Sequence, residues 1–564
     1  MQVQAVMVQN WLQFHDLAGF PLLTVLTLLP LAFGLVALLM PDDAPTLHKA
    51  WSFVGSLVTL AVALVLLGVF DRTAVGFQHV DDYSWIPSIG ARWTLGIDGI
   101  SIPLILLTAF LTPLVFIGAW SSIDKRWKEF SIAMLVLETG MLGSLVAIDL
   151  LTFYVFWEIM LVPMYLIVGI WGGKDRIYAT VKFFLYTMFG SLLMLVAILW
   201  LYQKSGGSFA LAQLAQLPLS PAEQKWMFAA FALAFLIKVP VFPFHTWLPD
   251  AHTEAPTPGS VVLAGVMLKL GTYGLLRFAI PLFPAAMGTF SPLLIALAVT
   301  GIVFGALMAY QQTDVKRLVA YSSVSHLGFV MLGIVIFNEE ALQGAVLQGV
   351  NHGISTGALF LLVGYIYERR HTREIADFGG IASRMPVYAA FFVFITFSSV
   401  ALPLTNGFVG EFLIFAGSFK DGIHARIAPP PPGMFGALHL WRNDVLIGSG
   451  IATLGIVLGA VYMLSMVRRV FFGQNTNPDN QGLRDLGTRE KCLMGVFCAF
   501  VLWIGIYPAS WLNLSKTTVH AMVQAERPSI QEVRAPLDFQ HEAQMAERQP
   551  DQDAAARQVN NAQR

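Results

Sequence analysis

The amino-acid sequence predicts an all-α polytopic membrane protein with about fourteen transmembrane helices, and three observations support that fold class. Of the 564 residues, 56% are hydrophobic and only 12% are charged, whereas a soluble domain has roughly 25% charged residues. The mean hydropathy is +0.66. Apolar runs recur along the chain, and many reach the length of about 20 residues that a helix needs to cross a bilayer.

The composition also excludes several classes of protein. Because 34 Lys and Arg residues balance 35 Asp and Glu residues, the chain lacks the net positive charge of a nucleic-acid binder. Its hydrophobic content excludes a disordered chain and an ordinary cytosolic enzyme. Two cysteines, Cys492 and Cys498, cannot supply a disulfide framework or a four-thiolate metal or iron–sulfur site. Neither a Walker-type loop nor a Gly-x-Gly-x-x-Gly turn predicts a nucleotide site.

The apolar runs place the expected membrane spans along the chain. Residues 1–20 contain no Lys or Arg, so a cleaved signal peptide is not expected. The fourteen helices are predicted near residues 20–40, 51–70, 101–120, 131–149, 150–171, 178–202, 227–248, 257–280, 292–310, 318–337, 341–367, 386–418, 446–467 and 493–512.

Two sets of five helices share a polar pattern that indicates an internal repeat. The second helix of each set carries a titratable residue, Glu158 or His326, and the fourth is interrupted by proline, at Pro240 or Pro403. Helices seven and twelve are therefore expected to be discontinuous. Because five helices is an odd number, successive units begin on opposite sides of the membrane, which makes the repeats inverted, as in many ion-coupled transporters.

This pattern divides the chain into five parts. They are the N-terminal helices 1–3 in residues 1–130, a first five-helix repeat in 131–280, a second, inverted repeat in 292–470, a last helix in 491–512 and a polar tail in 515–564. The tail is expected to be peripheral or disordered, since it is rich in Gln and Ala. The insertion at 421–443, with four consecutive prolines at Pro429–Pro432, has no interpretation from sequence.

Basic residues in the loops predict the orientation. Loops after odd-numbered helices hold 17 Lys and Arg, and those after even-numbered helices hold 8, a count that includes Lys316 on the odd side and Arg277 on the even side. The positive-inside rule makes the odd side cytoplasmic. Both termini are then expected on the periplasmic side.

Seven titratable residues fall inside the apolar runs, where a charge at the bilayer centre costs about 2.5–3.5 kcal/mol even on the mildest scale. A packing role is the alternative for each, because polar side chains also join membrane helices by hydrogen bonds. For Glu138 and for the histidines this alternative has about equal weight. The seven residues are Glu138, Glu158, Lys238, Lys269, His326, His352 and Glu411.

Lys238 and Glu411 lie beside predicted helix breaks. Pro240 follows Lys238 by two residues and Pro403 precedes Glu411 by eight. Broken membrane helices persist only where protein or water satisfies the freed backbone. Lysine suits proton handling there, because a buried ammonium can release its proton whereas an arginine stays charged.

The two histidines belong to polar stripes at helical spacing. Gln348, His352 and Thr356 are four residues apart on one face, and Ser322 shares a face with His326. Such stripes are typical of a hydrated path, and imidazole relays protons near neutral pH. A second pair, His245 and His252, flanks Pro249 at a helix end without a third ligand cluster, so neither a metal nor a haem is expected.

Three motifs resemble a known family. The segment 242–256, FPFHTWLPDAHTEAP, resembles the central motif of the antiporter-like subunits of respiratory complex I and of Mrp-type antiporters. The segments 95–101 (LGIDGIS) and 408–412 (FVGEF) are similar to the M type of subunit in bacterial NADH:quinone oxidoreductase, the counterpart of mitochondrial chain 4. The resemblance covers about residues 20–512, outside the proline-rich insertion and the tail.

The resemblance implies roles for the buried residues. Glu158 would be the carboxylate of an ion pair with Lys238, Lys269 the central relay and Glu411 the terminal group. His326 and His352 would line the hydrated axis, and Glu138 would join the relay. These roles imply a proton-translocating subunit in the bacterial inner (plasma) membrane, beside other membrane subunits that include antiporter-like neighbours. FMN, iron–sulfur clusters and quinone are expected in partner subunits, and this chain would bind no cofactor.

Three other functions stay open at this point. The first is an Mrp-type sodium/proton antiporter subunit, and the second is a membrane subunit of an energy-converting hydrogenase or a related complex. The third is a scaffold whose buried charges only hold neighbouring subunits. The 95–101 motif and Glu411 favour the complex I type as a resemblance, and no cluster of carboxylates favours sodium as the coupling ion.

Overall fold

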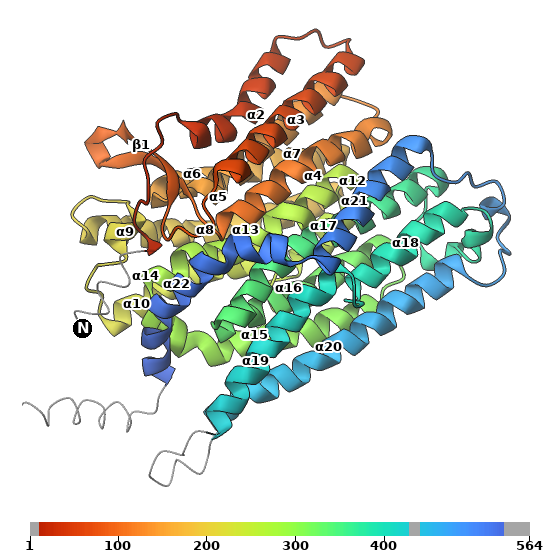
Figure 1. Ribbon diagram of the computed structural model, residues 1–564. Coiled ribbons are helices and arrows are strands. Elements are labelled where there is room, and N and C mark those ends of the chain that lie inside the picture. Colours follow the sequence, from red (N-terminus) through yellow and green to blue (C-terminus); the bar gives the residue numbers. More distant parts are fainter. Residues whose placement is uncertain (1–10, 428–439, 535–564) are drawn as a thin grey trace, which may run out of the picture.

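A computed structural model describes residues 11–427 and 440–534 as one bundle of long helices (Figure 1). The N-terminal helices are α2 Leu22–Leu38, α3 Pro45–Val69, α4 Ser101–Ser122, α5 Trp127–Val146, α6 Leu150–Ile159, α7 Leu161–Trp171, α8 Arg176–Lys204 and α9 Leu211–Leu214. The central helices are α10 Pro221–Lys238, α11 Trp247–Glu254, α12 Thr257–Val262, α13 Leu268–Gly274, α14 Ile280–Leu282, α15 Pro284–Tyr310, α16 Val315–Ile336 and α17 Glu339–Arg370. The C-terminal helices are α18 Pro386–Ser399, α19 Asn406–Ile427, α20 Leu440–Phe471, α21 Thr488–Ile506 and α22 Ala509–Arg534.

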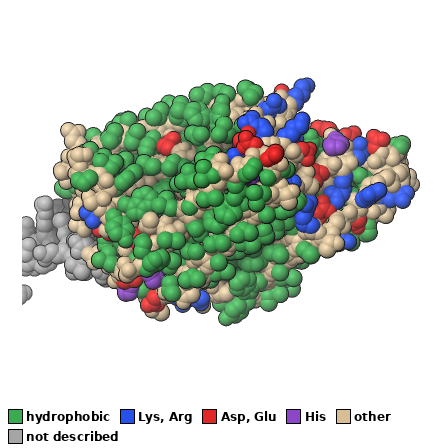
Figure 2. All heavy atoms as spheres, turned by 90° about the horizontal axis from the view of Figure 1, so that it is seen from above, with side chains coloured by type: hydrophobic (Ala, Val, Ile, Leu, Met, Phe, Trp, Pro, Cys, Tyr) green, Lys and Arg blue, Asp and Glu red, His purple; other side chains and the backbone are tan. Residues whose placement is uncertain are grey.

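Ten unbroken helices among the described residues are long and apolar enough to cross a membrane, or eleven if the bent pair α21 and α22 counts as one span. The other predicted spans fall on helices that are shorter or broken, such as α2 and α18. Figure 2 shows hydrophobic side chains across the middle of one face, with charged side chains gathered toward one end. That pattern is expected where lipid covers the middle of a bundle and water meets its ends.

The fold is not all-α, which corrects the predicted class in one detail. Strands β1 (Gln78–Ile86) and β2 (Ala91–Ile97) form a two-stranded antiparallel sheet between α3 and α4. Gly90 takes a left-handed conformation, with φ of 65°, at the turn between them. The hairpin lies between two spans and is too short and too mixed in polarity to produce an apolar run, so hydropathy alone does not predict it.

The innermost helices carry three of the seven predicted site residues, Lys269, His326 and His352. Every residue is buried in the most apolar stretch of the segment Thr257–Leu282, of α16 and of α17. In α3, α8 and α20 only 33–39% of that stretch is buried. In the middle of the bundle, a β-carbon on Gly353 would lie 2.7 Å from the carbonyl oxygen of Gly265. This close approach needs glycine, and it brings α17 against the segment that holds Lys269.

Two helices are interrupted where the prolines predict. α10 ends at Lys238 and α11 begins at Trp247, so Pro240 and Pro243 lie in the gap. α18 ends at Ser399 and α19 begins at Asn406, with Pro403 between them. Proline removes a backbone donor and clashes with the preceding turn, which is why the helices stop at these positions.

The C-terminal segment excludes one of the two predicted alternatives, disorder, for part of the tail. α22 continues as a helix to Arg534, and it is bent by 62° from α21 and packs along α15, α17 and α4. The first twenty residues of the predicted polar tail, 515–534, are therefore an ordered amphipathic helix. The rest of the tail, 535–564, and the run Pro429–Pro432 lie outside the described residues.

Two residues assigned to loops in the charge count are buried inside the bundle. Arg277 is 0% exposed within the helical segment Thr257–Leu282, and Lys316 is 5% exposed at the start of α16. Lys316 was counted among the loops after odd-numbered helices and Arg277 among those after even-numbered helices. Leaving both residues out of the count therefore keeps the excess of basic residues after the odd-numbered helices.

Candidate functional site

Lys269 lies at the centre of the bundle and bonds to a second helix. Its Nζ lies 2.7 Å from Nδ1 of His352 on α17 and also donates to the carbonyl oxygen of Ala264. Leu263–Met267, just before α13, is a π-helical turn. Such turns leave backbone carbonyls without their usual partners and are frequent at functional sites. The wider turn thus supplies the acceptor for a lysine that is 1% exposed.

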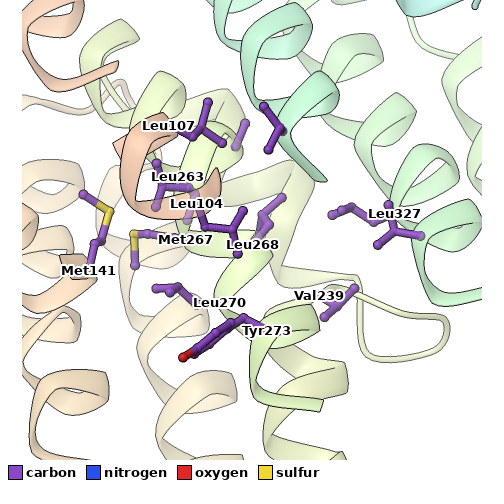
Figure 3. Close-up of a cluster of buried hydrophobic side chains, with 14 of the residues drawn as sticks. Leu104, Leu107, Met141, Val239, Leu263, Met267, Leu268, Leu270, Tyr273 and Leu327 are labelled. Carbon is purple, nitrogen blue, oxygen red and sulfur yellow. The ribbon is translucent and has the colours of Figure 1, made fainter. Parts of the chain in front are cut away.

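The helix that carries Lys269 also contributes to an apolar cluster. Figure 3 shows this cluster of buried hydrophobic side chains, among them Leu104, Leu107, Met141, Val239, Leu263, Met267, Leu268, Leu270, Tyr273 and Leu327. They come from α4, α5, α16 and the gap after α10 as well as from the helix itself. A dry environment of this kind strengthens electrostatic interactions, so the charge of Lys269 acts strongly on the few polar groups near it.

A row of titratable side chains continues from Lys269 to Glu411. The ring of His352 lies 5.9 Å from the ring of His326 on α16. His326 Nδ1 lies 3.2 Å from Oε1 of Glu411 on α19, and Gln348 Nε2 donates to the same oxygen at 3.1 Å. No direct hydrogen bond joins the two described rings, so transfer between them needs a water molecule or a ring rotation.

The break between α18 and α19 is held by polar side chains of α17. Asn351 donates from Nδ2 to the carbonyl oxygen of Asn406 at 2.7 Å and to Gln348 Oε1 at 3.2 Å. Ser398 donates to Asn406 Oδ1 at 2.6 Å and lies 2.6 Å from the hydroxyl of Ser355. These bonds join α17, α18 and the first residue of α19, and so fix the end of α19 that presents Glu411.

Lys238 is placed differently. Its Nζ is buried without a hydrogen-bond partner among the described residues and lies 4.5 Å from the ring centroid of Trp157. The ring provides a cation–π contact. No described ion pair within 4.0 Å joins Lys238 to Glu158, which is only partly buried and has one carboxyl oxygen enclosed without a hydrogen-bond partner. The structure thus brings the two residues to one region without the direct pair that the family implies.

Glu138 is more enclosed than Glu158. It is 0% exposed on α5, and neither of its carboxyl oxygens has a hydrogen-bond partner in the described part of the chain. An isolated buried carboxylate is costly, which sets Glu138 apart from Glu411 with its two side-chain partners.

A buried ion pair was missed from sequence. Arg277 Nη2 lies 2.5 Å from Asp98 Oδ1, and both side chains are at most 1% exposed. Arg277 also donates to the Tyr273 hydroxyl at 3.1 Å. Asp98 accepts the backbone N–H groups of Ile100 and Ser101 and so caps the first turn of α4. The place of Asp98 in the 95–101 motif was the only sequence signal for this pair. Because Asp98 precedes a predicted helix and Arg277 was assigned to a loop, nothing in the sequence indicated that they pair.

Two further basic groups are buried beside α11. Lys316 Nζ donates to the carbonyl oxygen of Ala255 and lies 3.5 Å from that of Thr253. His252 is 0% exposed, and its ring stacks on Phe360 at 4.6 Å between centroids. Neither ring nitrogen of His252 has a hydrogen-bond partner among the described residues.

The whole arrangement is suited to moving protons. Carboxyl, imidazole and ammonium groups near one another exchange protons without electron transfer, and burial makes their charge states depend on one another. In the described ranges, no three His, Cys, Asp or Glu residues converge as a metal site.

Comparison with known proteins gives a consistent result. Residues 147–427 match the family described as "NADH:quinone oxidoreductase/Mrp antiporter, TM". The chain is 43% identical to NADH-quinone oxidoreductase subunit M of Rhodobacter capsulatus over 519 residues, covering 89% of this chain and 96% of that protein. It is 38% identical to NADH-ubiquinone oxidoreductase chain 4 of Marchantia polymorpha over 503 residues, covering 89% and 97%.

A solved structure has the same fold. A chain of respiratory complex I from Thermus thermophilus, solved with bound NADH, matches with a TM-score of 0.77 and 31% sequence identity. The match covers 89% of this chain and 99% of that chain.

Proposed function

Because this chain belongs to the family of NADH-quinone oxidoreductase subunit M and chain 4, we propose that it is a proton-translocating membrane subunit of an NADH:quinone oxidoreductase. Its protons would move through buried Glu, Lys and His residues while other subunits oxidise NADH and reduce quinone. In this assignment the chain acts as part of the translocating enzyme and has no redox site of its own.

The observation that carries the proposal is the row Lys269, His352, His326 and Glu411. Lys269 and His352 are in direct contact at 2.7 Å, and His326 and Glu411 are 3.2 Å apart. Only the step between the rings of His352 and His326, whose centroids are 5.9 Å apart, needs a water molecule or a ring rotation. A proton released by Lys269 can therefore reach Glu411 with one intervening step.

Lys238 and Glu158 would control proton movement along this row through their charges. Two unit charges 4 Å apart interact by about 4 kcal/mol at an effective dielectric constant of 20. Since one pKa unit corresponds to about 1.36 kcal/mol, a movement that brings the Glu158 carboxylate into contact with Lys238 raises the proton affinity of Lys238 by orders of magnitude. Lys238, with no hydrogen-bond partner among the described residues, would follow that field and transmit it to Lys269, with Glu138 on the same route.

The membrane arrangement completes the proposal. The chain would cross the membrane about fourteen times, as two inverted five-helix repeats in 131–280 and 292–470 with helices seven and twelve broken, and with both termini periplasmic. It would lie in a bacterial inner (plasma) membrane beside other membrane subunits, including antiporter-like neighbours. FMN, iron–sulfur clusters and quinone would be held by partner subunits.

Lys269→Met in the assembled complex tests the proposal. The variant keeps side-chain length but cannot hold a proton, so proton pumping linked to NADH oxidation in inverted membrane vesicles is expected to fall at least ten-fold. A surface variant, Lys204→Met, serves as the control, because Lys204 pairs with Glu223 at the protein surface. Full pumping by assembled Lys269→Met would overturn the relay and favour a scaffold.

Purification of the native complex separates the alternatives. Flavin and iron–sulfur proteins that co-purify with this chain are expected for an NADH:quinone oxidoreductase. Recovery of membrane chains alone, with sodium-dependent proton release, would instead indicate an Mrp-type antiporter.

A further inference from the structure

A polar cavity lies at one end of the bundle, and none of the seven predicted site residues lines it. It is formed by the end of α2, the turn that leads into α3, and the loop between α4 and α5 together with the start of α5. The cavity volume is about 480 Å³, within the range of about 300–1,000 Å³ that is usual for small-molecule sites. The cavity therefore has room for a ligand with several polar groups.

The cavity lies where the membrane surface is expected. Both loops that form it follow odd-numbered spans, on the side where basic residues are in excess, and Arg126 and Lys128 line it. Leu38, which also lines the cavity, is 53% exposed, and Leu39, the next residue in the chain, is 87% exposed. Exposed apolar side chains on a membrane helix face acyl chains. A lipid can therefore lie along α2 with its headgroup in the cavity.

The charges of the lining leave one carboxylate over. Lys128 Nζ lies 2.6 Å from Asp42 Oδ1, and Arg126 Nε lies 3.0 Å from Glu129 Oε1. Asp124, the third carboxylate of the lining, forms no ion pair within 4.0 Å in the part of the chain that the structure describes. A positive group on a ligand would balance Asp124, whereas a ligand with only negative charge would be repelled by it.

Two buried rings of the lining each have a nitrogen without a partner. His48 is 1% exposed and Trp127 is 4% exposed, and neither His48 Nδ1 nor Trp127 Nε1 has a hydrogen-bond partner among the described residues. His48 Nε2 lies 2.9 Å from the carbonyl oxygen of Pro41. Because a carbonyl oxygen only accepts, Nε2 carries the hydrogen and Nδ1 of the neutral ring is an acceptor. Trp127 Nε1 is always a donor.

The lining thus combines one unused acceptor with one unused donor. Buried polar groups in native proteins nearly always have partners, and a ligand that has both an N–H group and an anionic oxygen would supply both. The start of α5 adds to the donor side. This helix begins at Trp127 without a side-chain cap, so the N–H groups of its first turn are available to an anion.

We propose that this cavity binds the headgroup of a membrane phospholipid that carries both a phosphate and a primary ammonium, as phosphatidylethanolamine does. The phosphate accepts hydrogen bonds from Trp127 Nε1, from the start of α5 and from the guanidinium of Arg126. The ammonium pairs with Asp124 and donates to His48 Nδ1. The acyl chains lie along the exposed side of α2. This inference is independent of the proposed proton relay, because it concerns lipid binding at a separate cavity.

The same groups discriminate against other ligands. A choline headgroup has no N–H group to donate to His48 Nδ1. Phosphatidylglycerol has the phosphate without the cation, so the charge of Asp124 stays unbalanced. Free O-phosphoethanolamine has the right polar groups but lacks the chains that lie along α2. We expect phosphatidylethanolamine to bind at least five-fold more tightly than each of these three.

Photocrosslinking in the purified complex tests the site. The complex is placed in phosphatidylcholine nanodiscs that contain a small fraction of phosphatidylethanolamine with a diazirine near the headgroup end of one acyl chain. After illumination, mass spectrometry of the digested chain is expected to find the label within residues 38–48 and 124–132, which line the cavity. Unlabelled phosphatidylethanolamine should reduce this labelling at least five-fold, and equal amounts of phosphatidylglycerol or O-phosphoethanolamine should not.

Two variants test the two ends of the headgroup separately. Asp124 and Arg126 are both exposed, so their substitution should leave the complex assembled. Asp124→Asn should bring the ratio of labelling by phosphatidylethanolamine and phosphatidylglycerol analogues close to one, because the amide no longer favours a cation. Arg126→Gln should reduce labelling by both analogues at least three-fold. Arg92→Gln is the matched control, because Arg92 is also a surface arginine paired with a carboxylate, that of Asp82 in the hairpin.

Three results would overturn the proposal. Equal labelling by the two analogues in the unaltered complex would show that the ammonium is not recognised. An unchanged ratio in Asp124→Asn would remove Asp124 from the site. Competition by O-phosphoethanolamine as strong as that by the lipid would indicate a site for a soluble phosphate ester. Since none of these measurements depends on pumping, the proposed function is judged separately by Lys269→Met.

Discussion

Two buried lysines of the bundle, Lys269 and Lys238, are held in opposite ways. Lys269 donates to a carbonyl oxygen and contacts His352, at one end of a row of paired groups that ends at Glu411. Lys238 has an aromatic ring beside it and no hydrogen bond to a described residue. The first lysine is stabilised by its partners, whereas the second is stabilised by little except the field of distant charges.

Because the two lysines differ in their hydrogen bonds, substitutions near them should affect the stability of the protein differently. Truncating one member of a satisfied buried network leaves its partners unsatisfied, which costs about 1–3 kcal/mol for each group. Removing an unpaired buried charge relieves a desolvation penalty instead. The region around Lys238 should therefore lose activity without losing stability, and the region around Glu411 should lose both.

The largest expected effect tests whether pairing also governs stability at the buried ion pair of Asp98 and Arg277. Arg277→Met leaves the carboxylate of Asp98 buried and unpaired, which costs about 3–5 kcal/mol. Thermal unfolding of the purified complex and its yield should both fall. The double variant Arg277→Met with Asp98→Asn removes both charges and keeps an acceptor for the first turn of α4, so it should recover most of the loss. A double variant as unstable as the single one would contradict this account.

Lys238→Met should reduce proton pumping at least ten-fold, equivalent to about 1.4 kcal/mol of activation free energy. Its melting temperature should equal or exceed that of the wild type, because the variant places an apolar chain beside Trp157. Pumping in vesicles and differential scanning of the solubilised complex measure the two quantities. A lower melting temperature would show that Lys238 is paired after all.

Glu158→Ala should also reduce pumping several-fold while leaving the complex assembled and its melting temperature within error. The reason is that Glu158 acts on Lys238 through its charge rather than through a hydrogen bond. Glu158→Asp, which retains the charge, should restore much of the rate. Equal loss in both variants would mean that side-chain shape matters more than charge.

Glu411 allows charge and hydrogen bonding to be separated. Glu411→Gln keeps an acceptor for Gln348 but cannot exchange a proton, so pumping should fall several-fold with little change in stability. Glu411→Ala should lower the free energy of unfolding by about 1–3 kcal/mol more than Glu411→Gln does, because Gln348 and His326 are left without their partner. If the two variants have equal melting temperatures, the network contributes nothing to stability.

Much of this molecule follows from local sequence. The apolar runs identify most helices to within a few residues, and Pro240 and Pro403 identify the two breaks, because helix length and proline geometry are local properties. The polar stripe on α17 likewise predicts that Gln348 and His352 face one side. The hairpin β1–β2 was missed because its strands lack an apolar run.

Pairing could not be predicted in the same way. Arg277 and Lys316 were assigned to loops from the ends of apolar runs, yet both are buried by neighbouring helices. Asp98 and Arg277 are 179 residues apart in the chain, and no local pattern connects them. The contact between Lys238 and Trp157 depends on how α10 packs against α6, and this packing leaves Glu158 at a distance.

The sequence by itself determined that the chain is a helical membrane protein, where its helices break and which buried residues can titrate, because hydropathy and proline geometry act over a few turns. Only the tertiary structure decided which of those residues meet. It joined Lys269 to His352 and His326 to Glu411, left Lys238 with an aromatic neighbour, and stacked His252 on Phe360. Such contacts span less than 6 Å in space and up to hundreds of residues in sequence, so they are fixed by helix packing.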